Sequence, residues 1–187
     1  ALAKGEIGES FFHLWGQAMD TLEDMEKIVL GILHGYCIGG GLQLALACDL
    51  RLAVSGAILG LGATRHGLIP DGAVYRLARV VGLGRAKELA LLNEHINPEE
   101  ARAMGLVNWV VLPGELEATT RRILDRLFDC SATAARWTKT LLNRSFHVDP
   151  RARGGDILAA ERECGASPEL EEANRAWLEK REPRFFK

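Results

Sequence analysis

The chain has 187 residues, of which 48% are hydrophobic and 26% charged, and its formal net charge is −2. This composition is ordinary for one globular domain with a sizeable core, and the weakly negative charge argues against a main role in binding nucleic acid or an anionic membrane surface. No apolar run approaches the roughly 20 residues of a membrane span and no signal segment opens the sequence, so we expect a cytoplasmic protein.

Along the first half of the chain, helical and strand-like patterns alternate. Residues 9–26 place apolar side chains at spacings of three and four, which predicts an amphipathic helix. The short apolar run 27–35 favours a buried strand of a parallel sheet. Residues 42–48 indicate a short buried helix, 50–54 a half-buried alternating strand, and 57–61 a further short strand.

A loop rich in glycine and proline follows at residues 62–72, and helical patterns dominate beyond it. Helices are predicted over 73–81, 84–92 and 98–105, with a connector at 93–97 and a strand at 107–111. Four more helices are predicted at 114–130, 132–145, 156–164 and 168–182, with breaks at Ser131, Asp149-Pro150 and Ser167-Pro168. The patterns therefore predict an α/β core over residues 1–112 and a helical region over 113–187.

The four cysteines are predicted to be free thiols. None belongs to a CxxC pair, and no histidine lies at zinc-ligand spacing from them. They are Cys37, Cys48, Cys130 and Cys164. The sequence thus offers no cluster that indicates a metal site.

Three consecutive glycines, Gly39–Gly41, separate two apolar runs. Glycine is less favourable than alanine inside a helix or strand by about 0.5–1 kcal/mol, so the run needs a reason. One explanation is a tight turn. The other is a ligand, because N–H groups at a helix start have no intrahelical acceptor and can stabilise an oxyanion. The spacing fits neither a GxGxxG dinucleotide site nor a phosphate-binding P-loop.

The stretches HGYCIGGGLQLALACDLRLA (34–53), GLIPDGAVYRLARVVGLGRAKELAL (67–91), INPEEARAMGLVNWVV (96–111) and WLEKREPRF (177–185) together resemble the enoyl-CoA hydratase/isomerase, or crotonase, superfamily. The resemblance implies a crotonase-like (ClpP/crotonase) fold of repeated β-β-α units with a C-terminal helical trimerisation region. It also implies a homotrimer or a dimer of trimers, an acyl-CoA or acyl-carrier thioester as substrate, and no cofactor. The N-terminal part of the family fold is expected upstream of residue 1.

By the same resemblance, Gly40 matches the second of two backbone N–H donors that stabilise an enolate. The first donor is expected upstream of residue 1. The residues that the resemblance places against the substrate are Ile38, Gly39, Gly40, Ala63, His66, Leu68 and Pro70.

The chain departs from the hydratases of this superfamily, which use two glutamates to add water. Gln43 and Ala63 occupy the matching positions, and neither side chain can act as a base. Asp71 is the candidate proton-transfer group, although an aspartate before a helix is also a favoured N-cap. An isomerase or lyase is therefore favoured. The alternatives are a hydratase with relocated groups, such as Asp71 and His66, and a non-catalytic acyl-CoA-binding or assembly subunit.

Overall fold

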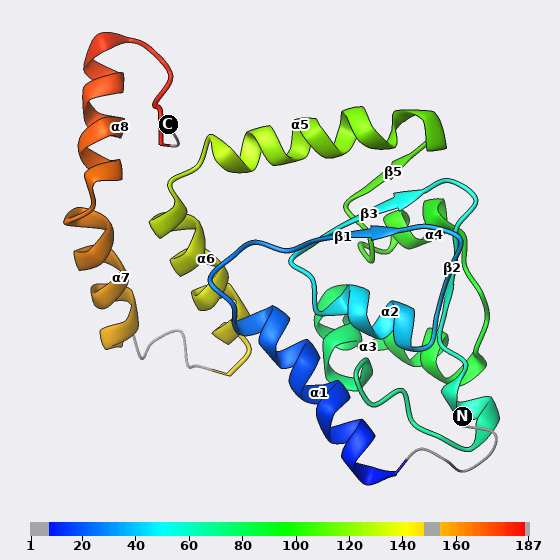
Figure 1. The fold of residues 1–187 in the computed structure, drawn as a ribbon. Helices are drawn as coiled ribbons and strands as arrows, with labels where there is room; N and C mark the ends of the chain where they lie inside the picture. The colour runs from blue at the N-terminus through cyan, green and yellow to red at the C-terminus, as the bar shows by residue number, and fades with distance from the viewer. Residues whose placement is uncertain (1–7, 148–153, 186–187) are drawn as a thin grey trace. The chain divides into compact units, whose positions relative to one another are not determined.

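The computed structural model describes residues 8–147 and 154–185 of the chain (Figure 1). These residues form two compact units. The first contains the chain up to Met25 together with Val29–Leu116, and the second contains Glu26–Ile28 together with Glu117 onward. Among the described residues, no helix is both long enough and apolar enough to cross a membrane.

The order of elements in the first unit confirms the expected repetition of β-β-α. The elements are α1 (Glu9–Asp24), β1 (Leu30–Leu33), β2 (Tyr36–Ile38), α2 (Gly40–Leu46), β3 (Leu50–Val54), β4 (Ile58–Gly60), the 3₁₀ helix η2 (Ala63–His66), α3 (Val74–Leu92), α4 (Pro98–Ala103), β5 (Trp109–Val111) and the 3₁₀ helix η3 (Pro113–Glu115). Thus β1-β2-α2 is followed by β3-β4-α3, each with two short strands and a helix.

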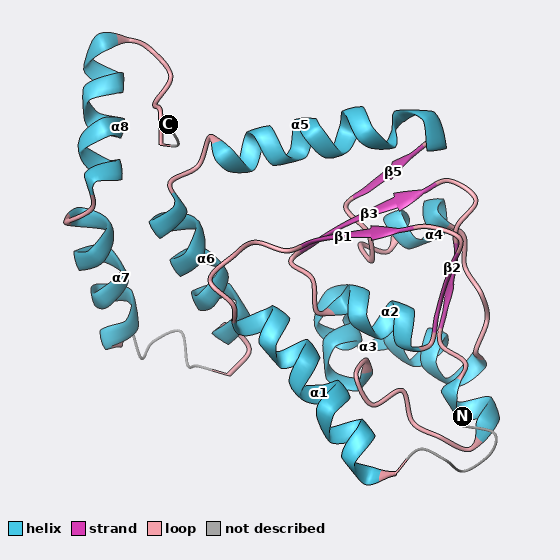
Figure 2. Ribbon diagram, viewed as in Figure 1, coloured by secondary structure: helices cyan, strands magenta, loops and turns pink. Residues whose placement is uncertain are grey.

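Two parallel sheets connect the two β-β-α repeats of the first unit (Figure 2). The larger sheet has the order β1-β3-β5, and the smaller one pairs β2 with β4. Leu30 pairs with Leu50 in the first sheet and Tyr36 with Ile58 in the second, so each β-β-α unit adds one strand to each sheet. The parallel pairing predicted for residues 27–35 is confirmed.

The central strand β3 corrects the prediction of a half-buried strand, because Arg51–Val54 are all buried. Arg51 is tolerated there because its polar groups are paired: Nε donates to Leu106 O at 2.7 Å and Nη1 to Cys48 O at 2.6 Å. Its backbone N–H donates to Asn108 Oδ1 at 2.8 Å. A buried cation is thus compatible with the middle of the sheet.

The core of the first unit lies between the strands and the helices α2, α3 and α4. Its fully buried large side chains include Leu33, Leu42, Leu59, Leu77 and Leu106. The helix α3 contains a break at Gly82 (φ 76°, ψ 159°), which separates the two helices predicted for this region. Strand β2 was not predicted, because three residues are too few for a periodicity to be recognised.

The second unit contains α5 (Leu116–Phe128, whose first residue belongs to the first unit), α6 (Ala132–Arg144), α7 (Gly155–Gly165) and α8 (Pro168–Glu179). Ser131 and Ser167 cap α6 and α8, since their Oγ atoms accept hydrogen bonds from Ala134 N and Leu170 N. The breaks predicted at these two serines are confirmed. The Asp149-Pro150 break lies outside the described residues.

Candidate active site

The first of the three glycines makes the turn between β2 and α2. Gly39 has φ 57° and ψ −117°, a conformation that residues with a Cβ rarely adopt. Its N–H donates to Gly60 O at 2.9 Å, and its carbonyl accepts from Gln43 N at 3.0 Å. Gly39 is therefore a glycine for structural reasons.

Gly40 differs from Gly39 because the fold does not require a glycine there. It is the first residue of α2, its φ is not positive, and a Cβ would make only an ordinary contact, 3.5 Å from Trp15 Cζ2. Within the described part of the chain, its N–H has no hydrogen-bond acceptor, as is usual at a helix start. Gly40 thus presents a free backbone donor, which favours the ligand explanation of the glycine run.

A hydrogen bond from α1 fixes the amide of Gln43 next to this donor. Trp15 Nε1 donates to Gln43 Oε1 at 2.8 Å, and Gln43 is only 6% exposed. An indole N–H can only donate, so the group that faces Trp15 is the carbonyl oxygen of the amide. An amide cannot act as a base in either orientation, and with its oxygen held by Trp15 the Gln43 side chain has its NH₂ group left to meet a ligand.

Met19, also from α1, fills the space between Gln43 and Gly72. The Met19 side chain is fully buried. A Cβ on Gly72 would lie 2.3 Å from Met19 Cε and 2.9 Å from Gln43 Oε1, so the backbone at Gly72 approaches both side chains closely. A water molecule between Gln43 and this loop would have to displace Met19.

An ion-pair cluster fastens α1 to the start of α3. Arg76 Nη2 lies 2.6 Å from Asp20 Oδ1 and 2.8 Å from Glu23 Oε2. Arg76 Nη1 also donates to Gly72 O at 3.2 Å. The same guanidinium thereby holds α1 and the loop before α3 together, and keeps Trp15 and Met19 over the site.

Asp71 is not the N-cap of α3, so that interpretation is wrong. The helix begins at Val74, its N-cap is Ala73, and no side chain caps it. The backbone N–H groups of Ala73 and Val74 both donate to Pro70 O instead. Asp71 is half-buried, and its carboxylate makes no hydrogen bond to another described residue. Asp71 directly precedes Gly72, whose backbone approaches Gln43 and Met19. The residue that carries this unpaired carboxylate is therefore the chain neighbour of that contact.

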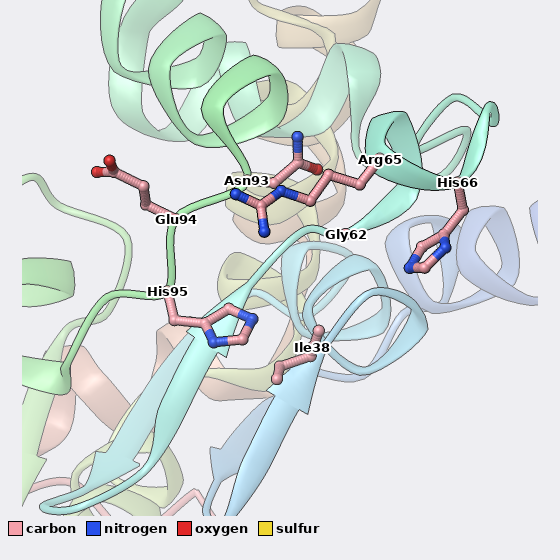
Figure 3. Close-up of a pocket in the computed structure, with 7 residues that line it drawn as sticks. All are labelled: Ile38, Gly62, Arg65, His66, Asn93, Glu94 and His95. Carbon is pink, nitrogen blue, oxygen red and sulfur yellow. The ribbon is translucent and has the colours of Figure 1, made fainter.

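A pocket of about 660 Å³ opens at the ends of β2 and β4 (Figure 3). It is lined by Ile38, Gly62, Arg65, His66, Asn93, Glu94 and His95. Of the predicted substrate-binding residues, Ile38 and His66 line this pocket. Ala63 lies at the start of η2, Leu68 is exposed and Pro70 is buried, and none of these three lines it.

Several residues of this site were not identified from the sequence. Trp15 and Met19 lie more than 20 residues before Gln43, so no local spacing relates them. The segment with Asn93 and His95 reaches the pocket because Ile96 forms an antiparallel β-bridge with Leu59. The only sequence signal for His95 was its place in the polar connector between two helices.

Across residues 8–147 and 154–185, no group of three or more His, Cys, Asp or Glu side chains could hold a metal ion. The four cysteines are free thiols, as predicted. Burial raises the pKa of the Cys37 thiol, which makes it a poorer nucleophile at neutral pH.

Sequence comparisons relate the chain to acyl-CoA enzymes. The enoyl-CoA hydratase/isomerase family model matches residues 3–187. The chain is 34% identical to the short-chain-enoyl-CoA hydratase of Clostridium acetobutylicum, over 96% of this chain and 69% of that protein. It is 31% identical to the mitochondrial Delta(3,5)-Delta(2,4)-dienoyl-CoA isomerase of Dictyostelium discoideum, over 91% of this chain and 59% of that protein.

Solved structures show the same likeness. The enoyl-CoA hydratase from Bacillus anthracis has a TM-score of 0.87 and 29% identity, over 98% of this chain and 74% of that chain. The enoyl-CoA hydratase/isomerase from Cupriavidus metallidurans CH34 has a TM-score of 0.89 and 30% identity, over 95% of this chain and 67% of that chain. These matches confirm the crotonase-like fold.

Proposed function

Because the chain belongs to the enoyl-CoA hydratase/isomerase family, we propose that it is an enzyme that binds an acyl thioester of coenzyme A or of an acyl carrier. The observation that carries this proposal is Gly40, whose N–H is unpaired at a position where the fold does not demand a glycine. A thioester oxygen held there gains a stronger hydrogen bond as it becomes an enolate oxygen. The Gly40 N–H would thus lower the barrier to removal of an α-proton.

Asp71 is the group that we propose to move this proton. Asp71 is half-buried and its carboxylate is unpaired among the described residues, as a base requires, and it directly precedes Gly72, whose backbone approaches Gln43. In an isomerisation, the carboxylate would take a proton from one carbon of the acyl chain and return it to another while the double bond shifts. The same enolate could instead expel a leaving group, which would be a lyase reaction.

Water addition is the less favoured reaction. It needs one group that takes a proton from water and another that delivers a proton to carbon. Gln43 can do neither because it is an amide, Ala63 has only a methyl group, and Met19 fills the space beside Gln43. Hydration by relocated groups, such as Asp71 and His66, remains the second candidate because the Clostridium acetobutylicum relative is named a hydratase.

Self-association is a further part of the proposal. The second unit exposes large apolar side chains, including Leu142, Phe146, Trp177 and Leu178. Such side chains are typical of surfaces that bind another subunit. They support the homotrimer or dimer of trimers that the family implies, which sedimentation velocity would test.

Exchange of the α-protons of pentanoyl-CoA in D₂O, followed by NMR, tests the enolate directly. We expect exchange with the unsubstituted protein and a loss of 100-fold or more with Asp71→Asn, the usual range for removal of a general base. Asp125→Asn on α5 is the matched control, since it makes the same change at an exposed position of the second unit. Exchange that survives Asp71→Asn would remove Asp71 as the base. Binding without any exchange would favour the non-catalytic acyl-CoA-binding or assembly subunit.

A further inference from the structure

The pocket of Figure 3 lies close in the chain to the site around Gly40. Ile38 lines the pocket and lies two residues before Gly40, so their α-carbons are at most about 7 Å apart. On the other strand, Gly62 lines the pocket two residues after Gly60, whose carbonyl accepts the Gly39 N–H. The ends of two parallel strands therefore join the pocket to the proposed thioester site, and ligands commonly bind at such strand ends.

The side chains that face this pocket are mainly cationic or hydrogen-bond donors. Arg65 and His66 come from η2, and His95 comes from the connector after α3; Figure 3 shows all three extending toward the same space. The one acid of the lining, Glu94, points away from them. None of the three has an ion pair or hydrogen bond with another described residue. The Arg65 guanidinium is thus a charge without a partner.

The pocket is also held in place by hydrogen bonds beneath it. Asn93 Nδ2 donates to Thr64 Oγ1 at 2.6 Å and to Leu91 O at 3.0 Å, and Thr64 Oγ1 donates to Ala90 O at 2.9 Å. These bonds fasten η2 to the end of α3. Asn93 Oδ1 is buried without a partner among the described residues and so is not exposed to an incoming group.

His95 is exposed, but its ring lies close to the scaffold. A Cβ on Gly60 would lie 2.7 Å from His95 Cδ2, so the imidazole lies directly over the backbone of β4. Glycine at this position leaves room for the ring. Arg65 and His95 are therefore presented from two segments that are tied to the scaffold, which lowers the entropic cost of binding a ligand between them.

We propose that this pocket binds the terminal carboxylate of the acyl group, so that the substrates are thioesters of dicarboxylic acids. The inference rests on the proposed function, because it places the thioester at Gly40. A planar guanidinium with an imidazole beside it suits a carboxylate, and charge-assisted hydrogen bonds of this kind are the stronger ones. The short reach from Gly40 to Ile38 suits the far end of a short acyl chain. The phosphates of coenzyme A are separated from the thioester by the whole pantetheine arm.

Isothermal titration with glutaryl-CoA and pentanoyl-CoA tests this assignment, because the two acyl chains have the same number of carbons and differ in the terminal carboxylate. We expect the protein to bind glutaryl-CoA about tenfold more tightly or better, the range for a hydrogen bond to a charged group. Arg65→Gln and His95→Gln should each reduce this preference toward one. Arg65 is exposed and unpaired, so its substitution should leave the fold intact.

Two controls separate this effect from a general change of charge. Arg85→Gln removes the same charge from an exposed position on α3, where Arg85 pairs with Glu88, and should leave the preference unchanged. Glu94→Gln removes the one acid of the lining and should not weaken glutaryl-CoA binding, since the Glu94 carboxylate points away from Arg65, His66 and His95.

Three results would overturn the assignment. The first is equal affinity of the unsubstituted protein for both thioesters. The second is an Arg65→Gln variant whose affinity falls equally for both thioesters and also for free coenzyme A, but does not fall for 3′-dephospho-CoA. This result would assign Arg65 to a coenzyme phosphate. The third is a preference for glutaryl-CoA that survives both pocket variants. In each case, α-proton exchange with pentanoyl-CoA would still report whether the proposed function holds.

Discussion

In the first unit, Met19, Leu52 and Leu106 are fully buried, whereas in the second unit Trp177 and Leu178 are 84% and 82% exposed. The first unit also buries Arg51 and Gln43, and each has specific hydrogen-bond partners. Few side chains of the second unit are buried, among them those of Ile123, Lys139 and Ala176. Close packing thus stabilises the first unit, and the second depends more on its caps and ion pairs.

This difference has a functional side. The candidate active site residues Gly40, Gln43 and Asp71 all belong to the first unit, where Trp15 holds the buried Gln43 by a hydrogen bond. The second unit presents apolar surface and charged clusters, such as Glu172 with Arg175 and Arg181. The unit that holds the candidate active site is therefore joined to a unit whose exposed apolar surface suits association.

Met19→Ala should have the largest effect on stability. It removes a fully buried side chain, and we expect it to lower the free energy of unfolding by about 2–5 kcal/mol, as measured by urea denaturation. Leu178→Ala in the second unit is the matched control and should change it by less than about 0.5 kcal/mol. Similar losses in the two variants would contradict the distinction between the units.

Gly39→Ala and Gly40→Ala should move stability in opposite directions. Alanine at Gly39 must adopt φ 57° and ψ −117°, which should cost about 1–3 kcal/mol. Alanine at Gly40 enters a helical position with ordinary contacts and should stabilise the protein by about 0.5–1 kcal/mol. Gly40→Ala should nevertheless slow α-proton exchange, because its methyl group would crowd the thioester oxygen. Unchanged exchange in this well-folded variant would argue against the role of Gly40.

Ser131→Ala tests the importance of capping in the second unit. Ser131 Oγ accepts from Ala134 N at 3.1 Å and donates to the Glu169 carboxylate. Loss of such an N-cap usually costs about 1 kcal/mol, which thermal unfolding would detect. Ser131→Thr keeps a hydroxyl that can accept from Ala134 N and donate to Glu169, and should recover part of this cost. A neutral Ser131→Ala would show that packing, not capping, holds α6.

Acidification should weaken the second unit through Glu172, the smallest effect of this series. Hydrogen bonds from Arg181 and Arg175, and from the Arg184 backbone N–H, hold the pKa of Glu172 well below its ordinary value. A depressed pKa in the folded state stabilises the protein above the unfolded-state pKa of about 4.3 and loses this contribution as the pH falls below it.

Glu172→Gln should therefore be less heat-stable than the unsubstituted protein at pH 7, and the difference should shrink below about pH 4. Circular dichroism at a series of pH values would measure both melting temperatures. A difference that stays constant with pH would show that the charge of Glu172 contributes nothing.

Most of the secondary structure could be predicted because long helices and buried strands leave a periodic pattern. The pattern failed where local preference and structure disagree. The helix α2 begins at Gly40, two residues before its predicted start. Glycine has a low helix propensity, so Gly40 and Gly41 were not expected to be helical, and the turn is made by Gly39 alone. The domain boundary predicted between residues 112 and 113 stays a prediction. The first compact unit ends at Leu116, and Glu117 belongs to the second.

The site was harder to predict than the fold. Gly40, Gln43 and Asp71 could be identified because they belong to recognisable motifs. Trp15 and His95 could not, because they reach the site through the tertiary arrangement of α1 and through the bridge between Ile96 and Leu59. A single sequence carries no local record of contacts between such distant positions.

The buried guanidinium of Arg51 has a consequence for the order in which the protein is made. Its acceptors include the carbonyl of Cys48, three residues before it, and that of Leu106, 55 residues after it. Until Leu106 has left the ribosome, the nascent strand β3 would bury a cation with an incomplete set of partners, which is unfavourable. We therefore expect the core of the first unit to remain open during synthesis of more than 50 residues beyond Arg51, and to close only when the segment before β5 emerges.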